Sequence, residues 1–523
     1  MIFRSPFPDI TIPDVPLTSF VLRHADRLAD RPALIDASSG RTLTYMDLTR
    51  EVGAVAAGLA ARGFGKGSVF GMYAPNCAEY AVALLAVASL GGIATTINSL
   101  ATADDLARQL IDSGATVLLT TPDLFDRSRS AVTATAVREV FVVGEVQGAT
   151  PFTDLRQTLG AIPDISIDLD DVVFLPYSSG TTGLPKGVMI THRNWVANIC
   201  QSEVPFLVTP QDVIFCLPPF FHMFGAWMLT QVLAGGGTLV MTPRFDLSTF
   251  LGAVQRHGVT RAVLVPPVVL ALVNDPSVDA YDLSTLAYVY SGAAPLGADL
   301  GRRCQERLGC TVLQGYGLTE TTPVATFAPV SGRMVKQGSV GPLVPNTECR
   351  VVDLATGSDL GPGERGELWI RGPQVMKGYL NRPDATAAMI DADGWLHSGD
   401  IGYADEDGDF FLIDRLKELI KYKAYQVAPA ELEAVLLSHP AVADAAVVSS
   451  PDDEAGEVPK AFVVLKAEVA AEELMAFVAA RVASYKKVRR LEIIDQIPKS
   501  PTGKILRRVL VERERAAMPE LVG

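Results

Sequence analysis

The 523-residue sequence predicts an α/β protein, and three features of the chain support this. Apolar, strand-like runs alternate with helix-like stretches through most of the sequence, a pattern typical of largely parallel sheets. After about Gly338 the chain changes to short strands separated by Gly and Pro turns, which indicates a small β-rich subdomain. After Asp414–Lys417 it has the pattern of a small α+β domain.

The predicted strands fall at regular places along the chain. They are expected at Thr116–Thr120, Glu139–Val143, Val172–Tyr177, Gly237–Met241, Arg261–Val265, Ala445–Ser449 and Lys460–Leu465. Tyr80–Ile97 carries no charge but contains Gly91-Gly92, so we expect a buried helix running into a strand rather than a membrane span.

The length predicts about three domains or subdomains, because one core rarely grows to this size. We expect an α/β subdomain over 1–170, a second over 171–340, the β-rich subdomain over 341–414 and the C-terminal domain over 415–523.

The composition excludes some classes of function. A net charge of −14 argues against a nucleic-acid binder, which needs Lys and Arg to neutralise phosphates. The exception is a basic run between Ser484 and Arg508, which fits either a solvated surface or an anionic small molecule. The six cysteines show no CxxC spacing, so neither a zinc site nor a disulfide framework is expected. The N-terminus lacks the pattern of a signal peptide, and we expect a cytoplasmic protein.

A glycine-rich loop over Tyr177–Gly187 is the strongest single motif. A phosphate chain needs close backbone N–H groups, hydroxyl donors and a cation, and this loop offers all three. The groups concerned are Ser178, Ser179, Gly180, Thr181, Thr182, Gly183 and Lys186. It is not a Walker loop, because Pro185 rather than Gly precedes the Lys.

This loop resembles the signature of the adenylate-forming (ANL) superfamily, which includes acyl-CoA ligases, 4-coumarate–CoA ligases and beetle luciferase. The resemblance covers essentially the whole chain. It is strongest to the 4-coumarate and medium-chain acid ligases, judged from Ile413–Lys423 and Gln426–Glu433. It implies activation of a carboxylic acid by ATP and Mg²⁺ as an acyl-AMP, and then transfer to coenzyme A. It also places the ATP and acyl sites in the second subdomain and makes the C-terminal domain mobile.

The resemblance assigns roles to nucleotide-binding residues in several motifs. Within the segment Gln314–Thr321, Gln314 and Gly315 belong to the nucleotide-binding wall. Tyr316 stacks on adenine, Thr319 touches the α-phosphate and Glu320 helps to hold Mg²⁺. Ser291–Pro295, with Ala293, forms another wall of the adenine and acyl pocket. Asp400 accepts hydrogen bonds from the ribose hydroxyls, with Arg415 as its companion.

Further residues serve the two half-reactions. His222, in the apolar run Pro218–Gly225, is either a core histidine or, as the resemblance implies, lies beside the substrate carboxylate. The resemblance implies that Lys504 stabilises charge that develops during adenylation, which would explain the basic run. It also implies that Lys417 is a hinge, about which the small domain exchanges the Lys504 loop for the Lys421–Gln426 loop. That second loop, which includes Lys423, would serve thioester formation.

One position departs from the family pattern. The family has Gly where this chain has Ala424, at a point that the pantetheine arm must pass. Ala424 is either neutral or impairs the CoA step, so that acyl-AMP passes to a partner acyltransferring enzyme or carrier protein. A non-catalytic nucleotide-binding protein is a third alternative, opposed by the intact Lys186, Glu320, Asp400, Arg415 and Lys504.

The acyl pocket carried over from the coumarate ligases is mostly apolar. It comprises Phe224, Trp227, Met228, Ala287, Tyr290, Ala293, Gly315 and Val324. Tyr290 is the only hydroxyl that could meet a phenol, so we expect hydroxycinnamates to be poorer substrates than apolar acids of similar size.

Overall fold

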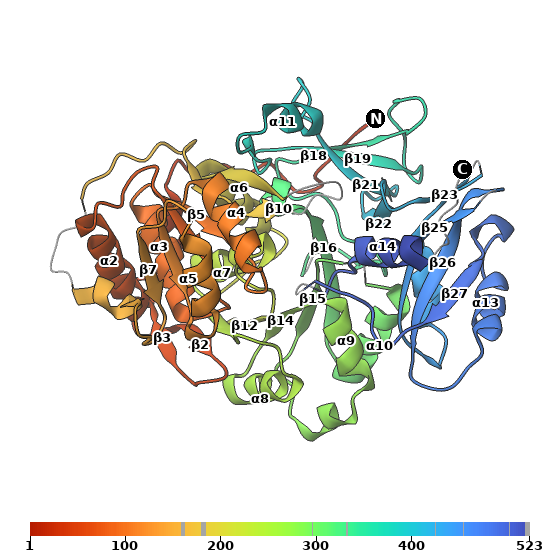
Figure 1. The fold of residues 1–523 in the computed structure, drawn as a ribbon, viewed down its shortest axis with the longest axis horizontal. Helices are drawn as coiled ribbons and strands as arrows, with labels where there is room; N and C mark the ends of the chain where they lie inside the picture. Colours follow the sequence, from red (N-terminus) through yellow and green to blue (C-terminus); the bar gives the residue numbers. More distant parts are fainter. Residues whose placement is uncertain are drawn as a thin grey trace.

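The computed structural model describes residues 1–157, 163–178, 185–294, 296–330, 333–423, 425–452, 454–500 and 503–517. It has four sheets and confirms the predicted α/β class. Figure 1 shows the chain passing from two helix-covered sheets to an antiparallel sheet and then to a smaller C-terminal domain at the other end of the molecule.

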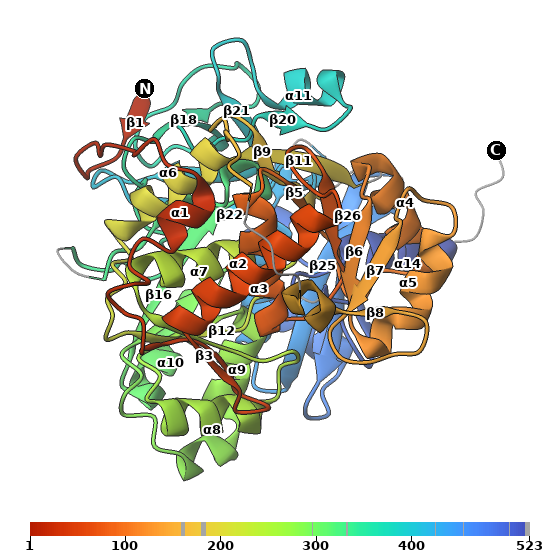
Figure 2. The same ribbon diagram turned by 90° about the vertical axis from the view of Figure 1, so that its left-hand side faces the viewer.

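The first sheet is parallel over most of its width, and it supplies the glycine-rich loop. Its strands, in spatial order, are β10 (Tyr177–Ser178), β11 (Lys186–Thr191), β9 (Val172–Phe174), β5 (Ile93–Thr96), β4 (Val69–Met72), β6 (Val117–Thr120), β7 (Glu139–Val142) and β8 (Thr150–Pro151), with β20 (Gly378–Tyr379) paired to β11. Its helices are α2 (Tyr45–Ala61), α3 (Ala78–Ser89), α4 (Ala103–Ser113) and α5 (Phe125–Val132). Figure 2 shows α2 and α3 lying side by side across this part of the molecule.

The second sheet forms the floor of the candidate site. Its order is β17 (Val324–Phe327), β16 (Thr311–Gly317), β15 (Tyr288–Ser291), β14 (Arg261–Leu264), β12 (Val213–Cys216), β13 (Thr238–Met241), β2 (Pro32–Asp36) and β3 (Thr42–Thr44). Its side chains alternate between two cores, as the two-residue period of a strand requires. One face joins the core with α3, α6 (His192–Glu203) and α7 (Met223–Gly235). The other meets α8 (Leu247–His257), α9 (Pro266–Asn274) and α10 (Ala298–Leu308).

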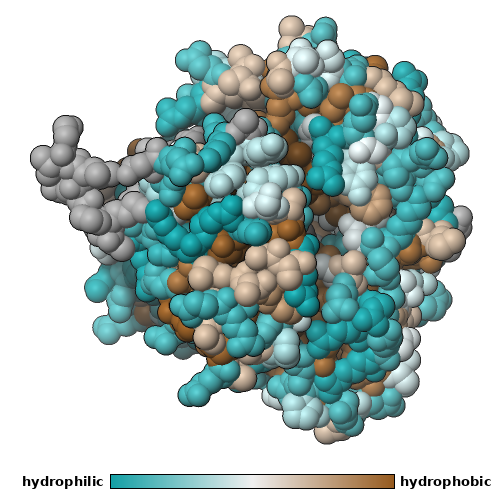
Figure 3. Space-filling view, turned by 90° about the vertical axis from the view of Figure 1, so that its right-hand side faces the viewer, coloured by the Kyte–Doolittle hydropathy of each residue, from teal (hydrophilic) through white to brown (hydrophobic). Residues whose placement is uncertain are grey.

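The remaining sheets are mainly antiparallel. The third contains β1 (Ile2–Arg4), β18 (Glu348–Val352), β19 (Gly366–Arg371), β21 (Leu396–Ala404) and β22 (Phe410–Arg415), and α11 (Pro383–Met389) lies beside it. The C-terminal domain contains β23 (Ile420–Tyr422), β24 (Tyr425–Val427), β25 (Val442–Asp452), β26 (Gly456–Leu465), β27 (Arg490–Ile493), α12 (Pro429–Leu437), α13 (Ala471–Ala479) and α14 (Arg507–Ala517). Lys417 lies in the turn that connects these two sheets. The solvent face of this domain is mostly hydrophilic (Figure 3).

The first and second sheets each contain strands from both sides of the predicted domain boundary at residue 170. The early strands β2 and β3 complete the second sheet, and the later strands β9 to β11 complete the first. β1 likewise joins the third sheet from the start of the chain. Local patterns place strands but do not say which distant strand each will pair with, so the division into domains stays a prediction.

The uncharged segment Tyr80–Ile97 forms most of α3 and all of β5, as expected. Its helix is buried from Ala78 to Ala88 between other helices and the sheets. No helix within the described ranges has the length and apolar character to cross a membrane.

Candidate active site

The predicted site residues gather at the carboxyl ends of the second sheet's parallel strands, where ligands bind in open α/β sheets. β15 leads to Ala293, β16 to Tyr316 and Glu320, and β12 to the loop that carries His222. The third sheet contributes Asp400 from β21, and the C-terminal domain contributes Lys504. Three separate parts of the chain therefore meet at one place.

The ribose-side pair is preformed. The Tyr316 hydroxyl donates to Asp400 Oδ2 over 2.8 Å, and Arg415 Nε lies 3.2 Å from Oδ1. Asp400 and Arg415 are direct partners across β21 and β22. Burial raises the pKa of the Asp400 carboxyl, while Arg415 and the Tyr316 hydroxyl oppose that rise. Two partners thus hold the Asp400 carboxyl in place, which suits the predicted role of an acceptor for ribose hydroxyls.

Glu320 is the residue that fits Mg²⁺. Its carboxylate is buried and accepts a 2.8 Å hydrogen bond from the Tyr379 hydroxyl, and Lys186 Nζ lies 4.2 Å from the centre of the Tyr379 ring. Among the described residues there is no group of three or more His, Cys, Asp or Glu side chains that could by itself hold a metal ion. Mg²⁺ often binds through one or two carboxylates plus substrate phosphates, so a single carboxylate beside the phosphate loop suits it. When bound, Mg²⁺ would neutralise phosphate charge.

The ends of the glycine-rich loop are fixed by strand pairing. Ser178 pairs with Lys186 between β10 and β11, and the adjacent Tyr177 hydroxyl donates to Asp112 over 2.7 Å. Ser179, Gly180, Thr181 and Thr182 fall outside the described residues. Their phosphate-binding roles therefore stay predictions.

Lys504 lies close to both the nucleotide side and the acyl side. Burial and the charge of Arg415 lower its pKa, whereas Glu418 and Asp400 act in the opposite direction. The preceding Gly503 has φ +77°, and a Cβ placed there would lie 3.3 Å from Pro267 at the start of α9. The C-terminal domain is therefore docked with its Lys504 loop against the large part of the chain.

His222 caps the N-terminus of α7 and carries a defined tautomer. Its Nδ1 accepts the Phe224 N–H over 3.3 Å, which leaves Nε2 to carry the proton in the neutral ring. Burial, with a smaller effect from the Lys504 charge, lowers the pKa of His222 to about 4. Neutral His222 can thus donate an N–H to a carboxylate, which favours the functional interpretation over a core histidine.

The His222 loop is held by a residue that the sequence analysis missed. Asn76 is buried; it donates to the Pro218 carbonyl over 3.2 Å and accepts from the Phe220 N–H over 2.7 Å. Gly225 is also required, since a Cβ there would lie 2.2 Å from the Pro219 carbonyl oxygen. Asn76 has no motif of its own, so no signal in the sequence could have found it. The same is true of Tyr379.

The acyl side is an aromatic and aliphatic wall. The Phe224 and Trp227 rings stack with centroids 6.2 Å apart and 15° between planes, and a Cβ on Gly292 would lie 2.8 Å from the Phe224 ring. Met228, Tyr290 and Val324 are buried nearby. Ala293 holds a left-handed conformation at φ +67° beside them, and Gly315 packs against Phe327. Ala287 differs from the prediction, because it is exposed just before β15 and does not line this wall.

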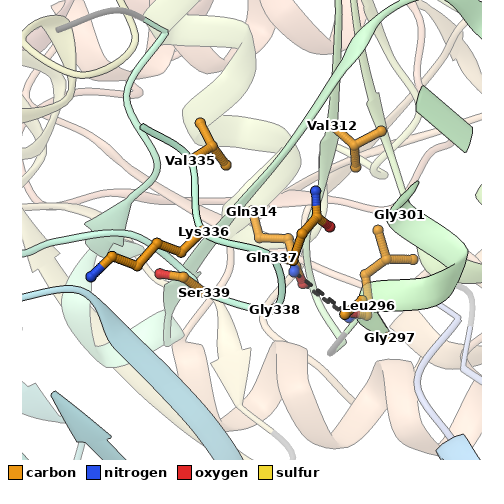
Figure 4. Close-up of a pocket in the computed structure, with 11 residues that line it drawn as sticks. Leu296, Gly297, Gly301, Val312, Gln314, Val335, Lys336, Gln337, Gly338 and Ser339 are labelled. Carbon is orange, nitrogen blue, oxygen red and sulfur yellow. Dashed lines mark hydrogen bonds between the residues drawn. The ribbon is translucent and has the colours of Figure 1, made fainter. Parts of the chain in front are cut away.

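Gln314 is engaged within the protein. Its Oε1 accepts the Leu296 N–H over 3.0 Å, and its Nε2 lies 3.4 Å from the Leu296 carbonyl (Figure 4). The adjoining pocket, about 10 Å³, is too small for a nucleotide. Gln314 thus fixes the loop after β15, and direct contact with the nucleotide stays a prediction. Thr319, the first residue of the short 3₁₀ turn Thr319–Thr321 that contains Glu320, is partly exposed.

The residues predicted for the CoA step lie elsewhere. Lys421 and Gln426 pair across the β23–β24 hairpin, both are exposed, and Lys423 bonds Glu454 over 2.7 Å. Within the described ranges, no hydrogen bond or ion pair joins these three to the Lys504 site. Ala424 falls outside the described residues. In this arrangement the Lys504 loop, and not the β23–β24 hairpin, lies at the candidate site.

The fold and site are those of an enzyme that binds a nucleotide and a carboxylic acid beside a buried lysine from the C-terminal domain. The model of the AMP-binding enzyme family matches residues 21–380, and that of the AMP-binding enzyme C-terminal domain matches residues 431–504. The chain belongs to this family of AMP-binding enzymes.

Two known proteins show how far the similarity extends. The chain is 44% identical to 4-coumarate–CoA ligase 5 of Oryza sativa subsp. japonica, over 99% of this chain and 98% of the relative. The anthranilate CoA ligase AuaEII, solved with anthranoyl-AMP, has a TM-score of 0.88 at 26% identity and covers 97% of this chain and 98% of its own.

These findings confirm the predicted activity: ATP-dependent formation of an acyl-AMP followed by transfer to CoA, by an AMP-forming acid–CoA ligase. Its partners are a small-molecule acid, ATP and CoA. The comparisons do not favour an adenylating enzyme with an impaired CoA step or a non-catalytic nucleotide binder. They also give no support for a partner acyltransferase or carrier protein. The amide bond synthetase McbA of Marinactinospora thermotolerans shares the fold at a TM-score of 0.84 and 27% identity, covering 95% of this chain and 99% of its own.

Proposed function

We propose that this ligase activates a bulky acid with a largely apolar body, either aryl, alicyclic or medium-chain acyl. The observation that carries the proposal is the stacked pair of Phe224 and Trp227 next to the His222 loop. An apolar acid gains about 25 cal/mol for each Å² buried against such a wall. The relatives named for coumarate and anthranilate support the aryl alternative. A cytoplasmic location remains part of the proposal.

In the first half-reaction His222 Nε2–H orients the acid's carboxylate toward the α-phosphate. A carboxylate oxygen attacks phosphorus, the bond to the bridging oxygen breaks, and pyrophosphate leaves. Lys504 stabilises the negative charge that develops on those oxygens. Asp400 and Tyr316 hold the nucleoside, and Glu320 would bind the metal that accompanies the phosphates; their hydrogen bonds to each other and to Tyr379 support these roles.

In the second half-reaction the C-terminal domain turns about Lys417 and brings the Lys421–Gln426 hairpin to the site. The CoA thiol loses its proton and attacks the acyl carbon, and AMP leaves. The exposure of Lys421 and Gln426 in the present arrangement supports this exchange, since neither is engaged in the Lys504 site.

Pyrophosphate release measured over a panel of acids tests the proposal. Octanoate, cyclohexanecarboxylate and cinnamate should each exceed acetate by about tenfold or more in kcat/KM, because two or more additional methylenes are buried. Mass spectrometry should detect the acyl-CoA only when CoA is present. Acetate as the best substrate would contradict the proposed acid class.

A further inference from the structure

One side chain contacts two of the candidate phosphate-site groups at the same time. The Tyr379 hydroxyl donates to Glu320 Oε1 over 2.8 Å, and Lys186 Nζ lies over the face of the same ring, 4.2 Å from its centroid. Tyr379 is 4% exposed and Glu320 is 5% exposed, so the hydrogen bond between them is shielded from water. Lys186 begins β11 of the first sheet, whereas Glu320 follows β16 of the second. Tyr379 therefore joins two charged groups that come from different sheets.

The backbone of Tyr379 is fixed by its neighbours. β20 pairs with β11, with Tyr379 opposite Val188, and lies next to α11 (Figure 2). The Tyr379 N–H donates to Thr386 Oγ1 over 2.9 Å, and the N–H of the next residue, Leu380, donates to the Gly187 carbonyl over 2.8 Å. Because this backbone is held on both sides, the Tyr379 side chain can set the positions of its two charged partners.

The chain just before Tyr379 also holds the backbone around Glu320. The Met376 N–H donates to the Glu320 carbonyl over 2.9 Å, and the Thr322 hydroxyl donates to the Gln374 carbonyl over 2.7 Å. The backbone and the side chain of Glu320 are therefore both bonded to this one segment, which leaves the carboxylate little freedom to move.

A phenol suits this position. Burial and the Glu320 charge raise the pKa of Tyr379, so its hydroxyl stays protonated and remains a donor near neutral pH. The ring face attracts the Lys186 ammonium while the hydroxyl attracts the carboxylate, so the rigid ring holds the two charges at separate places. Within the described ranges, Lys186 and Glu320 form no ion pair with each other. Direct contact between them would neutralise both charges and make each less available to a bound triphosphate.

We propose that Tyr379 is a positioning residue for adenylation. Its hydroxyl holds the Glu320 carboxylate for Mg²⁺, and its ring holds the Lys186 ammonium for the phosphates and apart from that carboxylate. This inference rests on the roles proposed for Glu320 and Lys186, and it adds a residue that acts on the nucleotide only through them.

Calorimetry of ATP binding to the full-length enzyme, with no acid present, tests this role. The magnesium gain is defined as the dissociation constant of ATP in EDTA divided by that in Mg²⁺. Tyr379→Phe keeps the ring but removes the bond to Glu320, so the magnesium gain should fall by about fivefold or more. Tyr379→Leu removes the ring as well, so binding of ATP in EDTA should also weaken, by about threefold or more.

The Glu320→Gln background shows whether Tyr379 acts through the carboxylate. Glu320→Gln should itself lower the magnesium gain at least as far as Tyr379→Phe does. In that background Tyr379→Phe should change the gain by no more than about twofold, because the carboxylate that it positions is gone. The effect of Tyr379→Leu on ATP binding in EDTA should also shrink to about twofold or less, since Lys186 then has no carboxylate to pair with.

Tyr45→Phe is the matched control. Tyr45 is buried, and its hydroxyl donates to the Gly237 carbonyl over 2.7 Å. Gly237 comes just before β13, at the amino ends of the parallel strands of the second sheet and so at the edge opposite the site. Tyr45→Phe therefore removes a buried donor of the same kind, and its magnesium gain should stay within about twofold of the parent.

A second variant covers the case in which Tyr379→Phe does not fold. Thr386→Val removes the acceptor of the Tyr379 N–H and so loosens the backbone that places the ring. It should lower the magnesium gain by about threefold or more.

The outcomes separate the inference from the roles on which it rests. A magnesium gain that survives in Glu320→Gln would overturn the metal role of Glu320, and the inference with it. A gain that Glu320→Gln abolishes but Tyr379→Phe leaves at the parental value would overturn the role of Tyr379 alone. Equal effects of Tyr379→Phe in the parent and in the Glu320→Gln background, or an equal fall in Tyr45→Phe, would also overturn it. The proposed acid class is tested separately, because no acid is present in this measurement.

Discussion

The Tyr316 hydroxyl donates a 2.8 Å hydrogen bond to Asp400 Oδ2, and so ties β16 of the second sheet to β21 of the third. The two residues are far apart in sequence and buried together. One interaction therefore fixes both the aromatic ring predicted to contact the base and the carboxylate predicted to contact the ribose.

Tyr316→Phe should raise the KM for ATP by about fivefold to tenfold. The ring is kept, but the buried carboxylate loses a donor worth about 1 kcal/mol or slightly more. Pyrophosphate-release kinetics at varied ATP would measure this. Tyr403→Phe, elsewhere on β21, is the matched control and should behave as the parent; an unchanged KM in Tyr316→Phe would remove this bond from nucleotide binding.

Lys504→Ala should reduce pyrophosphate release on the order of 100-fold or more, since its charge acts on the transition state. Binding of ATP, measured by calorimetry, should stay largely intact. The exposed Lys466 makes the control, because Lys466→Ala causes the same charge change away from the site. Equal turnover in Lys504→Ala and the parent would exclude a catalytic role for Lys504.

Gly503→Ala should slow adenylation about tenfold while leaving thioester formation from supplied acyl-AMP near the parental rate. A Cβ at φ +77° costs about 1–2 kcal/mol and would press on Pro267, but only while the Lys504 loop is docked. Gly408→Ala carries similar strain at φ +80° with open space around it, so it should not alter the ratio of the two half-reactions. Equal slowing of both half-reactions in Gly503→Ala would contradict the docking argument.

The pH profile of adenylation should show no inflection from His222 near pH 6.5. Its pKa is lowered to about 4, so the ring stays neutral until the pH approaches that value, and protonation then removes the Nδ1 acceptor. Because the unfolded state binds this proton at higher pH than the folded state, His222 also lowers stability as pH falls from about 6.5 toward 4. An NMR titration assigned with His222→Gln would measure the pKa. A midpoint near 6.5 would contradict the burial argument.

Ala424→Gly should leave the rate of acyl-CoA formation within about twofold of the parent, since a single methyl is often accommodated by a small backbone shift. Quantitative mass spectrometry of the thioester, with hydroxylamine trapping of the adenylate, would compare the two steps. A large gain in acyl-CoA without a change in pyrophosphate release would revive the impaired-CoA interpretation.

The sequence by itself determined the fold class and the activity, and it located most of the candidate nucleotide-binding residues. Strand and helix periodicity is local, and the loop around Lys186 and the segments around Tyr316, Asp400 and Lys504 are contiguous motifs, so each can be recognised without knowing what lies beside it. The same holds for the buried helix and strand within Tyr80–Ile97.

Only the tertiary structure decided which distant groups meet. β2 and β3 complete a sheet made mostly of later strands, Asn76 holds the His222 loop, and Tyr379 reaches Glu320 from β20. The buried ion pair of Arg261, in β14, and Asp212, just before the neighbouring strand β12 of the second sheet, is a further case. Whether a buried donor has a partner depends on every neighbour in three dimensions, and no local pattern in the sequence records that.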